Sequence, residues 1–298
     1  MPSIWRIVAS TLDRLSTARP AYAAAAFLLY VVSLFIAGAR WRGFLRAQGG
    51  EVGVMRATLA TLGGIAAGNL TPAPGGEACR IALVRLGGRA TWRDATIAAV
   101  WDRLSELPPI LVLTLMSLVA VRHLASGRNG LIGIGASVAM VILAFALWRL
   151  RRSGFLNTGW RERMARGRVR LPLFLAGVAY STALWLQDFL RLTCVTLAFG
   201  VVLSPTQIAT LCVLAMLGGV VPGVAGLGPV EGGLVAGLMA FGVDLPTAAA
   251  VTALERAISY GFSTSAGAIV IALMGGGSVW SAARRVQAPS SDGDAARS

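Results

Sequence analysis

The sequence predicts an all-α, polytopic helical membrane protein with two broken or re-entrant helical segments related as an inverted repeat. The first observation is composition: of 298 residues, 56% are hydrophobic and only 13% are charged, whereas a soluble chain carries about 25% charged residues. The second is a series of apolar runs long enough to cross a bilayer. The third is a pair of apolar segments that are interrupted by glycine and proline and share one order of charged residues.

Residue usage excludes most catalytic chemistry. The net charge is +14 and all 27 basic residues are arginine, so no lysine is present for a Schiff base or a P-loop. A single histidine and three isolated cysteines (Cys79, Cys194 and Cys212) cannot assemble a metal centre or a histidine-based triad. We therefore expect no enzyme activity, no cofactor and no metal. We also expect no nucleic-acid partner, because the arginines lie between apolar runs without aromatic stacking motifs.

The chain opens with an amphipathic segment and then enters the membrane. Residues 1–20 intersperse arginines among apolar side chains, as in a helix that lies in the membrane interface. The run 21–39 is about long enough to span. It ends at Arg40, Trp41 and Arg42, a combination typical of an interfacial anchor.

The transmembrane domain is expected over 21–282, followed by a disordered cytoplasmic tail over 283–298. Further spans are predicted at about 95–121, 130–150, 171–200 and 246–274. The run 171–200 is also long enough to form two shorter pieces.

Two apolar segments, 57–79 and 207–243, do not read as simple spans because glycine and proline interrupt them. Irregular backbone at membrane depth persists only where protein buries it or where it lines a wet cavity. We therefore interpret both as re-entrant hairpins or broken helices. Small-residue spacings allow close helix approach at Gly64/Gly68, Gly219/Gly223 and Gly233/Gly237.

The distribution of arginine predicts the orientation. The stretch 149–170 holds eight arginines and one acid, which places it in the cytoplasm together with the C-terminus. If the chain changes sides at each predicted span before this stretch, the N-terminus lies outside. The first broken segment then opens from the inner side and the second from the outer side, the arrangement of transporters whose broken helices meet around a substrate.

The two units, about 57–121 and 207–274, repeat one order of features. Each has a glycine- and proline-rich break, a glutamate, an alanine-rich helix and an acid–arginine pair. Glu77 precedes Arg103 by 26 residues, and Glu231 precedes Arg256 by 25. Because adjacent residues on a helix do not face each other, we expect Arg103 to reach Glu77 and Arg256 to reach Glu231.

Six acids lie within apolar or broken segments, where an ionised group is costly. They are Glu77, Asp102, Glu106, Asp188, Glu231 and Glu255. One interpretation is that they form internal salt bridges that hold the bundle together. The other is that they line a substrate path, in which arginine contacts a phosphate through its planar fork.

The stretch 68–80 (GNLTPAPGGEACR) resembles the first signature of the lysylphosphatidylglycerol synthase transmembrane region, also called the flippase-like family. The stretch 222–231 (PGVAGLGPVE) resembles its second signature, and Arg103 and Arg256 match its helix arginines. The resemblance, over roughly 20–280, implies a multi-pass protein of the bacterial inner (plasma) membrane that moves lipids between leaflets. Relatives are associated with aminoacylated phospholipids, polyprenyl-linked sugars and hopanoids. Synthetase activity is not expected, because no soluble synthetase domain follows within the 298 residues.

The resulting expectation is a protein that translocates an anionic or polyprenyl-type lipid, with membrane lipids as its partners. An accessory subunit that partners a lipid-modifying enzyme and a small-solute secondary transporter are the alternatives. The expected substrate-binding residues are Asn69, Glu77, Arg80, Arg103, Glu231 and Arg256. The expected supporting residues are Pro72, Gly76, Asp102, Glu106, Asp188, Arg191, Pro222, Gly228 and Glu255.

Overall fold

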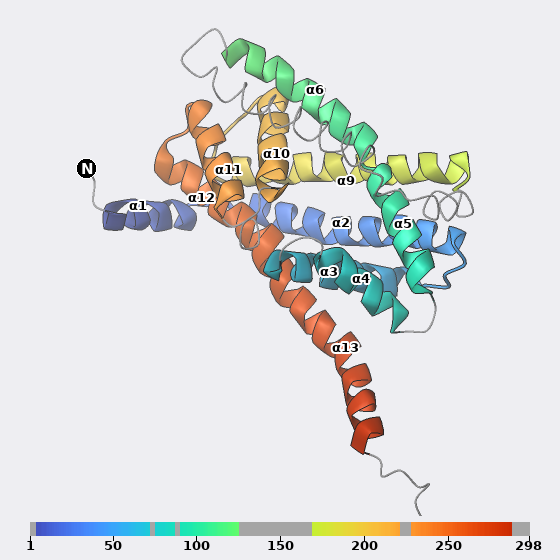
Figure 1. Cartoon of the computed structure of the whole chain (residues 1–298). Helices are drawn as coiled ribbons and strands as arrows, with labels where there is room; N and C mark the ends of the chain where they lie inside the picture. The colour runs from blue at the N-terminus through green and yellow to red at the C-terminus, as the bar shows by residue number, and fades with distance from the viewer. Residues whose placement is uncertain (1–3, 72–74, 87–89, 125–168, 221–227, 288–298) are drawn as a thin grey trace, which may run out of the picture.

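The computed structural model describes residues 4–71, 75–86, 90–124, 169–220 and 228–287, and over these ranges it contains helices and no strand (Figure 1). In chain order the helices are α1 (Ile4–Ser16), α2 (Pro20–Ala47), α3 (Val54–Leu70), α4 (Gly75–Arg85), α5 (Trp92–Leu104), α6 (Leu107–Leu124), α9 (Leu171–Ala198), α10 (Pro205–Val220), α11 (Pro229–Ala240), α12 (Leu245–Arg256), the π-helix η1 (Ala257–Phe262) and α13 (Ser263–Gln287).

The long helices α2 and α9 lie alongside each other and form the centre of the bundle (Figure 1). Each starts with a proline in its first turn, where the missing N–H has no intrahelical acceptor to lose. One buried apolar cluster joins α2 to α3, α4 and α5, and includes Trp41 and Phe44. A second cluster joins α2 and α9 to α10, α11 and α12, and includes Leu192 and Leu211. The two units thus pack on one shared pair of helices.

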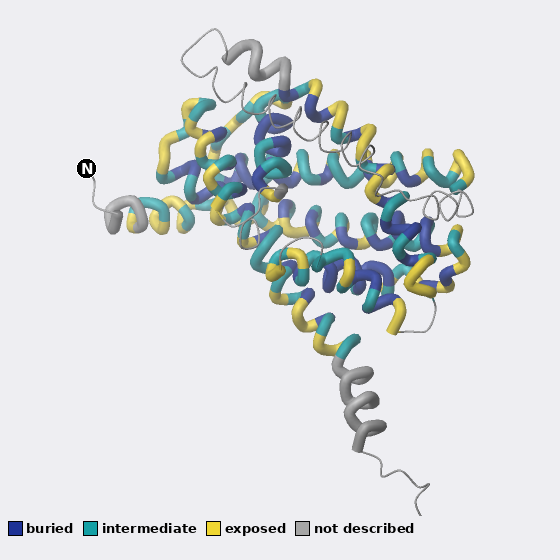
Figure 2. The backbone as a smooth tube through the Cα atoms, in the orientation of Figure 1, coloured by how far each residue is buried: buried dark blue, intermediate teal, exposed yellow. Residues whose placement is uncertain are grey.

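Within the described residues, three helical stretches are long and apolar enough to cross a membrane: Pro20–Ala47, Leu171–Ala198 and Leu245–Gly275. Their outward faces carry large exposed apolar side chains, and Figure 2 shows exposed positions in yellow along the bundle surface. Leu28, Leu186 and Leu273 are 63%, 57% and 76% exposed. Exposed apolar side chains of this kind suit a lipid environment, and the three stretches confirm an all-helical chain with candidate membrane-spanning helices. The run at 171–200 forms one continuous helix, α9, and not two pieces.

Two expected spans change in the structure. The first span extends past residue 39 to Ala47, and Trp41 is fully buried, so the interfacial-anchor interpretation of Arg40 and Trp41 is wrong. The single span expected at 95–121 is divided into α5 and α6. Pro108 and Pro109 account for this break, since neither supplies the N–H that would bond back to the preceding turn. The predicted span at 130–150 lies outside the described residues.

Both ends of the chain carry helix. α1 is strongly amphipathic, as predicted for residues 1–20, and it packs against α12. α13 continues to Gln287, so residues 283–287 are helical where a disordered tail was expected. Residues 288–298 lie outside the described part of the chain.

Each broken segment contains two helices that pack against each other: α3 with α4, and α10 with α11. Glycines allow the close approach in both. A Cβ on Gly76 would lie 2.7 Å from the carbonyl oxygen of Gly64, and a Cβ on Gly218 would lie 2.7 Å from the Cα of Val230. A Cβ on Gly237 would meet α10 in the same way, 2.7 Å from Leu211.

The three predicted glycine spacings therefore behave differently. Gly64 and Gly68 face Gly76 on α4, and Gly233 and Gly237 face α10, as their spacing predicts. At Gly219 no described atom lies within 4 Å of a built Cβ, and Gly223 is outside the described residues. That spacing does not mark a helix contact in the described structure.

Candidate functional site

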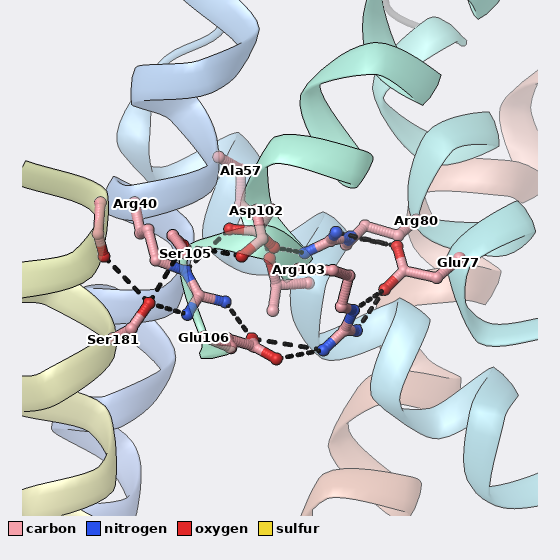
Figure 3. Close-up of polar contacts among 11 residues, drawn as sticks. Arg40, Ala57, Glu77, Arg80, Asp102, Arg103, Ser105, Glu106 and Ser181 are labelled. Carbon is pink, nitrogen blue, oxygen red and sulfur yellow. Dashed lines mark hydrogen bonds and ion pairs between the residues drawn. The ribbon is translucent and has the colours of Figure 1, made fainter. Parts of the chain in front are cut away.

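The first unit brings Glu77 and Arg103 together from two different helices (Figure 3). Glu77 lies in the first turn of α4 and Arg103 in the last turn of α5. Arg103 Nε donates to Glu77 Oε1 at 3.0 Å, and a second nitrogen of the guanidinium contacts the same oxygen. Arg103 also donates to Glu106 Oε2 at 3.1 Å. The predicted pairing of Arg103 with Glu77 is confirmed.

Asp102 stands at the centre of the same network. It is fully buried, and its two oxygens accept from two different arginines: Arg40 Nε at 2.7 Å and Arg80 Nη1 at 2.9 Å. Arg40 also donates to Glu106 at 2.5 Å, and Arg80 donates to Glu77 at 3.0 Å. Asp102 therefore joins α2 and α4 to α5.

The network is electrically balanced, because Arg40, Arg80 and Arg103 face three carboxylates. Polar and aromatic neighbours support it. Arg40 donates to the hydroxyl of Ser181 on α9 at 2.8 Å, and Arg80 lies 4.2 Å from the ring centroid of Trp41. Its members differ in access: the side chain of Arg103 is 59% exposed, and that of Arg80 is 5% exposed. Arg103 is thus the cation within reach of a ligand.

The second unit repeats the pairing. Glu231 lies in the first turn of α11, and its Oε1 accepts from Arg256 Nε at 2.7 Å, which confirms the other predicted pair. Its Oε2 accepts from the backbone N–H of Gly228 at 2.6 Å, so the same carboxylate also caps the start of α11. Gly228 has a φ of +97°, a conformation that favours glycine. This accounts for the glycine at position 228.

A short chain of contacts connects the second unit to the first. The guanidinium of Arg256 lies 4.8 Å from the ring centroid of Tyr260, which is part of the π-helix η1. The Tyr260 hydroxyl donates to the carbonyl oxygen of Asn69 at 3.2 Å. The Asn69 amide donates to Thr264 at 2.9 Å. Asn69 is the penultimate residue of α3, just before the first break, so the end of α3 contacts η1 and α13, which follow directly after Arg256 at the end of α12. A π-helical turn in such a place is a frequent feature of functional sites.

A third charged group surrounds Arg191 on α9. Arg191 donates to Glu255 Oε1 on α12 at 2.6 Å and to Asp188 Oδ1 at 3.1 Å. Its guanidinium also lies 5.7 Å from the ring centroid of Tyr30. Two carboxylates share one arginine here, unlike in the balanced first network.

The expected site residues thus fall into three groups. Glu77, Arg80, Asp102, Arg103 and Glu106 form the first network. Asn69, Gly228, Glu231 and Arg256 are brought together by the second pair and Tyr260, while Asp188, Arg191 and Glu255 form the third group. Gly76 acts by letting α4 approach α3. Pro72 and Pro222 lie outside the described residues.

Sequence reasoning missed Arg40 and Tyr260. Arg40 followed an apolar run next to a tryptophan, the pattern of a membrane-interface anchor, yet it is 5% exposed and pairs with two acids. The available signal was the charge imbalance near Asp102 and Glu106, since two acids within an apolar run require more positive charge than Arg103 alone supplies. Tyr260 lies four residues after Arg256, which places both on one helix face.

Comparison with known proteins assigns a family. The model of the lysylphosphatidylglycerol synthase transmembrane region matches residues 4–267. A UPF0104 membrane protein of Methanothermobacter thermautotrophicus is 28% identical over an alignment that covers 88% of each chain. The UPF0104 membrane protein PH1989 of Pyrococcus horikoshii is 24% identical over an alignment that covers 90% of this chain and 91% of its own. No solved structure matches.

Proposed function

The chain belongs to the family of the lysylphosphatidylglycerol synthase transmembrane region, and we propose that it moves an anionic or polyprenyl-type lipid between the leaflets of the plasma membrane. In this proposal it is a multi-pass protein with a cytoplasmic C-terminus and acts without enzymatic chemistry. Arg103 and Arg256 contact the lipid phosphate, and Glu77 and Glu231 hold these arginines when no lipid is bound.

The observation that carries the proposal is the repeated glutamate–arginine pair. In both units the glutamate lies in the first turn of a helix that follows a break, and the arginine comes from the end of the next helix. A helix start in a low dielectric offers free backbone N–H groups and a positive dipole end. Together with an arginine fork it forms a favourable environment for a phosphate.

Exchange of partners gives a route for binding and release. A lipid phosphate competes with the glutamate for the same guanidinium, so each arginine passes between an internal and a ligand-bound pair. Arg103 is the more exposed of the two, 59% against 20% for Arg256. Arg80, which is buried and already engaged by Glu77 and Asp102, positions Glu77 in this scheme.

The link between the units supports the proposal that they act on one path. Tyr260 contacts Arg256 on one side and Asn69 on the other. A movement of Arg256 toward a lipid phosphate therefore disturbs the end of α3, next to the first break. This coupling is what alternating access between two broken segments requires.

Leaflet exchange in liposomes tests the proposal. Purified protein is reconstituted with a fluorescently labelled phosphatidylglycerol, and the outer-leaflet label is bleached with dithionite, with and without a pH gradient. We expect faster exchange than in protein-free liposomes, and at least a tenfold loss for Arg103→Gln and Arg256→Gln. Arg85→Gln is the matched control, because Arg85 is an exposed arginine at the far end of α4. Exchange at the protein-free rate would refute translocation of this lipid class.

A second candidate is an accessory membrane subunit of a lipid-modifying enzyme, in which the charges only stabilise the bundle. The buried group formed by Arg40, Asp102 and Arg80 favours it, since these side chains are engaged on all sides by protein. The two functions predict different behaviour for Arg103→Gln. A structural role lowers the melting temperature of the purified protein, whereas a lipid-binding role leaves it nearly unchanged and slows exchange.

A further inference from the structure

The group around Arg191 opens into a cavity that the proposed function does not use. The cavity measures about 180 Å³ and is lined by α9, α10, α11 and α12. Asp188, Arg191 and Glu255 supply its charged wall, and Leu192, Cys212 and Leu234 supply part of its apolar wall. Its charge comes from two carboxylates and one guanidinium, so these lining groups sum to one negative charge.

The carboxylates of this cavity retain unused acceptors. Glu255 is 6% exposed, and within the described part of the chain its Oε2 is buried without a hydrogen-bond partner. Asp188 uses Oδ1 for Arg191, and its side chain is 43% exposed. A buried acceptor left unpaired is costly, and a single arginine does not balance two carboxylates. A cation with several N–H donors would pair with both carboxylates and balance their formal charge.

An apolar groove adjoins the cavity at Trp185, which lines both. The groove measures about 380 Å³ and lies between α6 and α9, with walls that include Pro108, Val112, Met116 and Phe189. Trp185 and Asp188 lie one turn apart on α9, so the charged wall and the groove follow each other along one helix. In a membrane-spanning protein a groove of this composition suits a hydrocarbon chain.

We propose that the cavity and the groove together form a binding site for a cationic amphiphile, with an ammonium head between Asp188 and Glu255 and an alkyl chain in the groove. The ammonium supplies the positive charge and the donors that the two carboxylates lack. Arg191 holds both acids in place from the opposite side. The site uses residues other than the two glutamate–arginine pairs, so it does not depend on translocation.

Photo-crosslinking tests the site in its membrane. The probe is dodecylamine with a diazirine in its chain, added to the full-length protein in phosphatidylcholine nanodiscs, and mass spectrometry locates the label. We expect labelling of α6 and α9 around Met116 and Trp185. Unlabelled dodecylamine should suppress it at a concentration at least tenfold lower than dodecanol or butylamine.

Two variants test the head position. Asp188→Asn and Glu255→Gln should each reduce labelling at least fivefold, and Asp94→Asn, an acid outside the cavity, should leave it unchanged. Asp188→Asn is the milder change, because Arg191 keeps Glu255 as its partner, so it remains informative if Glu255→Gln does not fold. Equal competition by dodecanol would overturn the ammonium head, and equal competition by butylamine would overturn the alkyl-chain groove. Native-level labelling of Asp188→Asn would overturn the proposed residues. Labelling requires no transport, so a failure here is distinguishable from a failure of leaflet exchange.

Discussion

Replacing Asp102 with asparagine removes the charge at the centre of the first network while keeping the side-chain volume. Asp102 is fully buried and accepts from Arg40 at 2.7 Å and from Arg80 at 2.9 Å. The network has three arginines and three acids, so Asp102→Asn leaves one buried positive charge uncompensated. We expect the variant to be far less stable than the native protein.

The magnitude follows from the cost of breaking a buried ion pair by removing one partner, about 3–5 kcal/mol. This is a large part of the roughly 5–15 kcal/mol that stabilises a typical domain. Removing the excess cation as well should restore part of the loss. The double variant Arg40→Gln/Asp102→Asn should be destabilised by about 1–3 kcal/mol less than the sum of the two single destabilisations, as expected for residues in direct contact.

Unfolding in mixed micelles of maltoside and dodecyl sulfate, followed by circular dichroism, measures these differences. Asp94→Asn is the control, since Asp94 lies in the first turn of the same helix and outside the network. A change of less than about 0.5 kcal/mol for Asp102→Asn, the range of ordinary surface substitutions, would refute the reasoning. So would strict additivity in the double variant.

Three further changes test local features. Gly76→Ala should destabilise by about 1–3 kcal/mol in the same unfolding assay, because the new Cβ meets backbone of α3 at 2.7 Å; Gly232→Ala, whose Cβ meets no described atom within 4 Å, should not destabilise. Asp244→Ala should cost about 1 kcal/mol by removing the cap of α12. Hydrogen bonding by Thr247 lowers the pKa of Asp244. The stabilisation by the cap is therefore present at neutral pH and is lost as the pH falls through that pKa. The thermal unfolding midpoints of the native protein and the variant should converge in acid. Tyr260→Phe should cost about 0.5–1.5 kcal/mol through loss of the bond to Asn69; an unchanged midpoint would show that this bond contributes nothing to the link between the units.

The sequence predicts the helical membrane class and both glutamate–arginine pairs. The pairs are predictable because 26- and 25-residue separations place each arginine at the end of the helix that follows its glutamate. The helix breaks are also readable, since Gly75, Gly76 and Pro229 mark new helix starts.

The sequence does not predict the ion pairs between helices that are far apart in the chain. Arg40 is 62 residues from Asp102, and only the packing of α2 against α5 brings them together. Trp41 has the composition of an interface anchor, yet Arg80 stacks on it in the interior. The contacts of Arg40 and Trp41 are tertiary outcomes, and local pattern does not determine them. The division of 95–121 into α5 and α6 has a different origin: it follows from Pro108 and Pro109, within a run whose overall apolar composition predicts a single span.

In the proposed function a lipid phosphate replaces the glutamates as the partner of Arg103 and Arg256. A structure of the protein in phosphatidylglycerol nanodiscs would reveal this exchange. We expect lipid density with its phosphate in hydrogen-bonding contact with one of these guanidiniums, and the corresponding Glu77 or Glu231 pair opened. Ordered lipid found only elsewhere on the bundle, with both pairs closed, would contradict it.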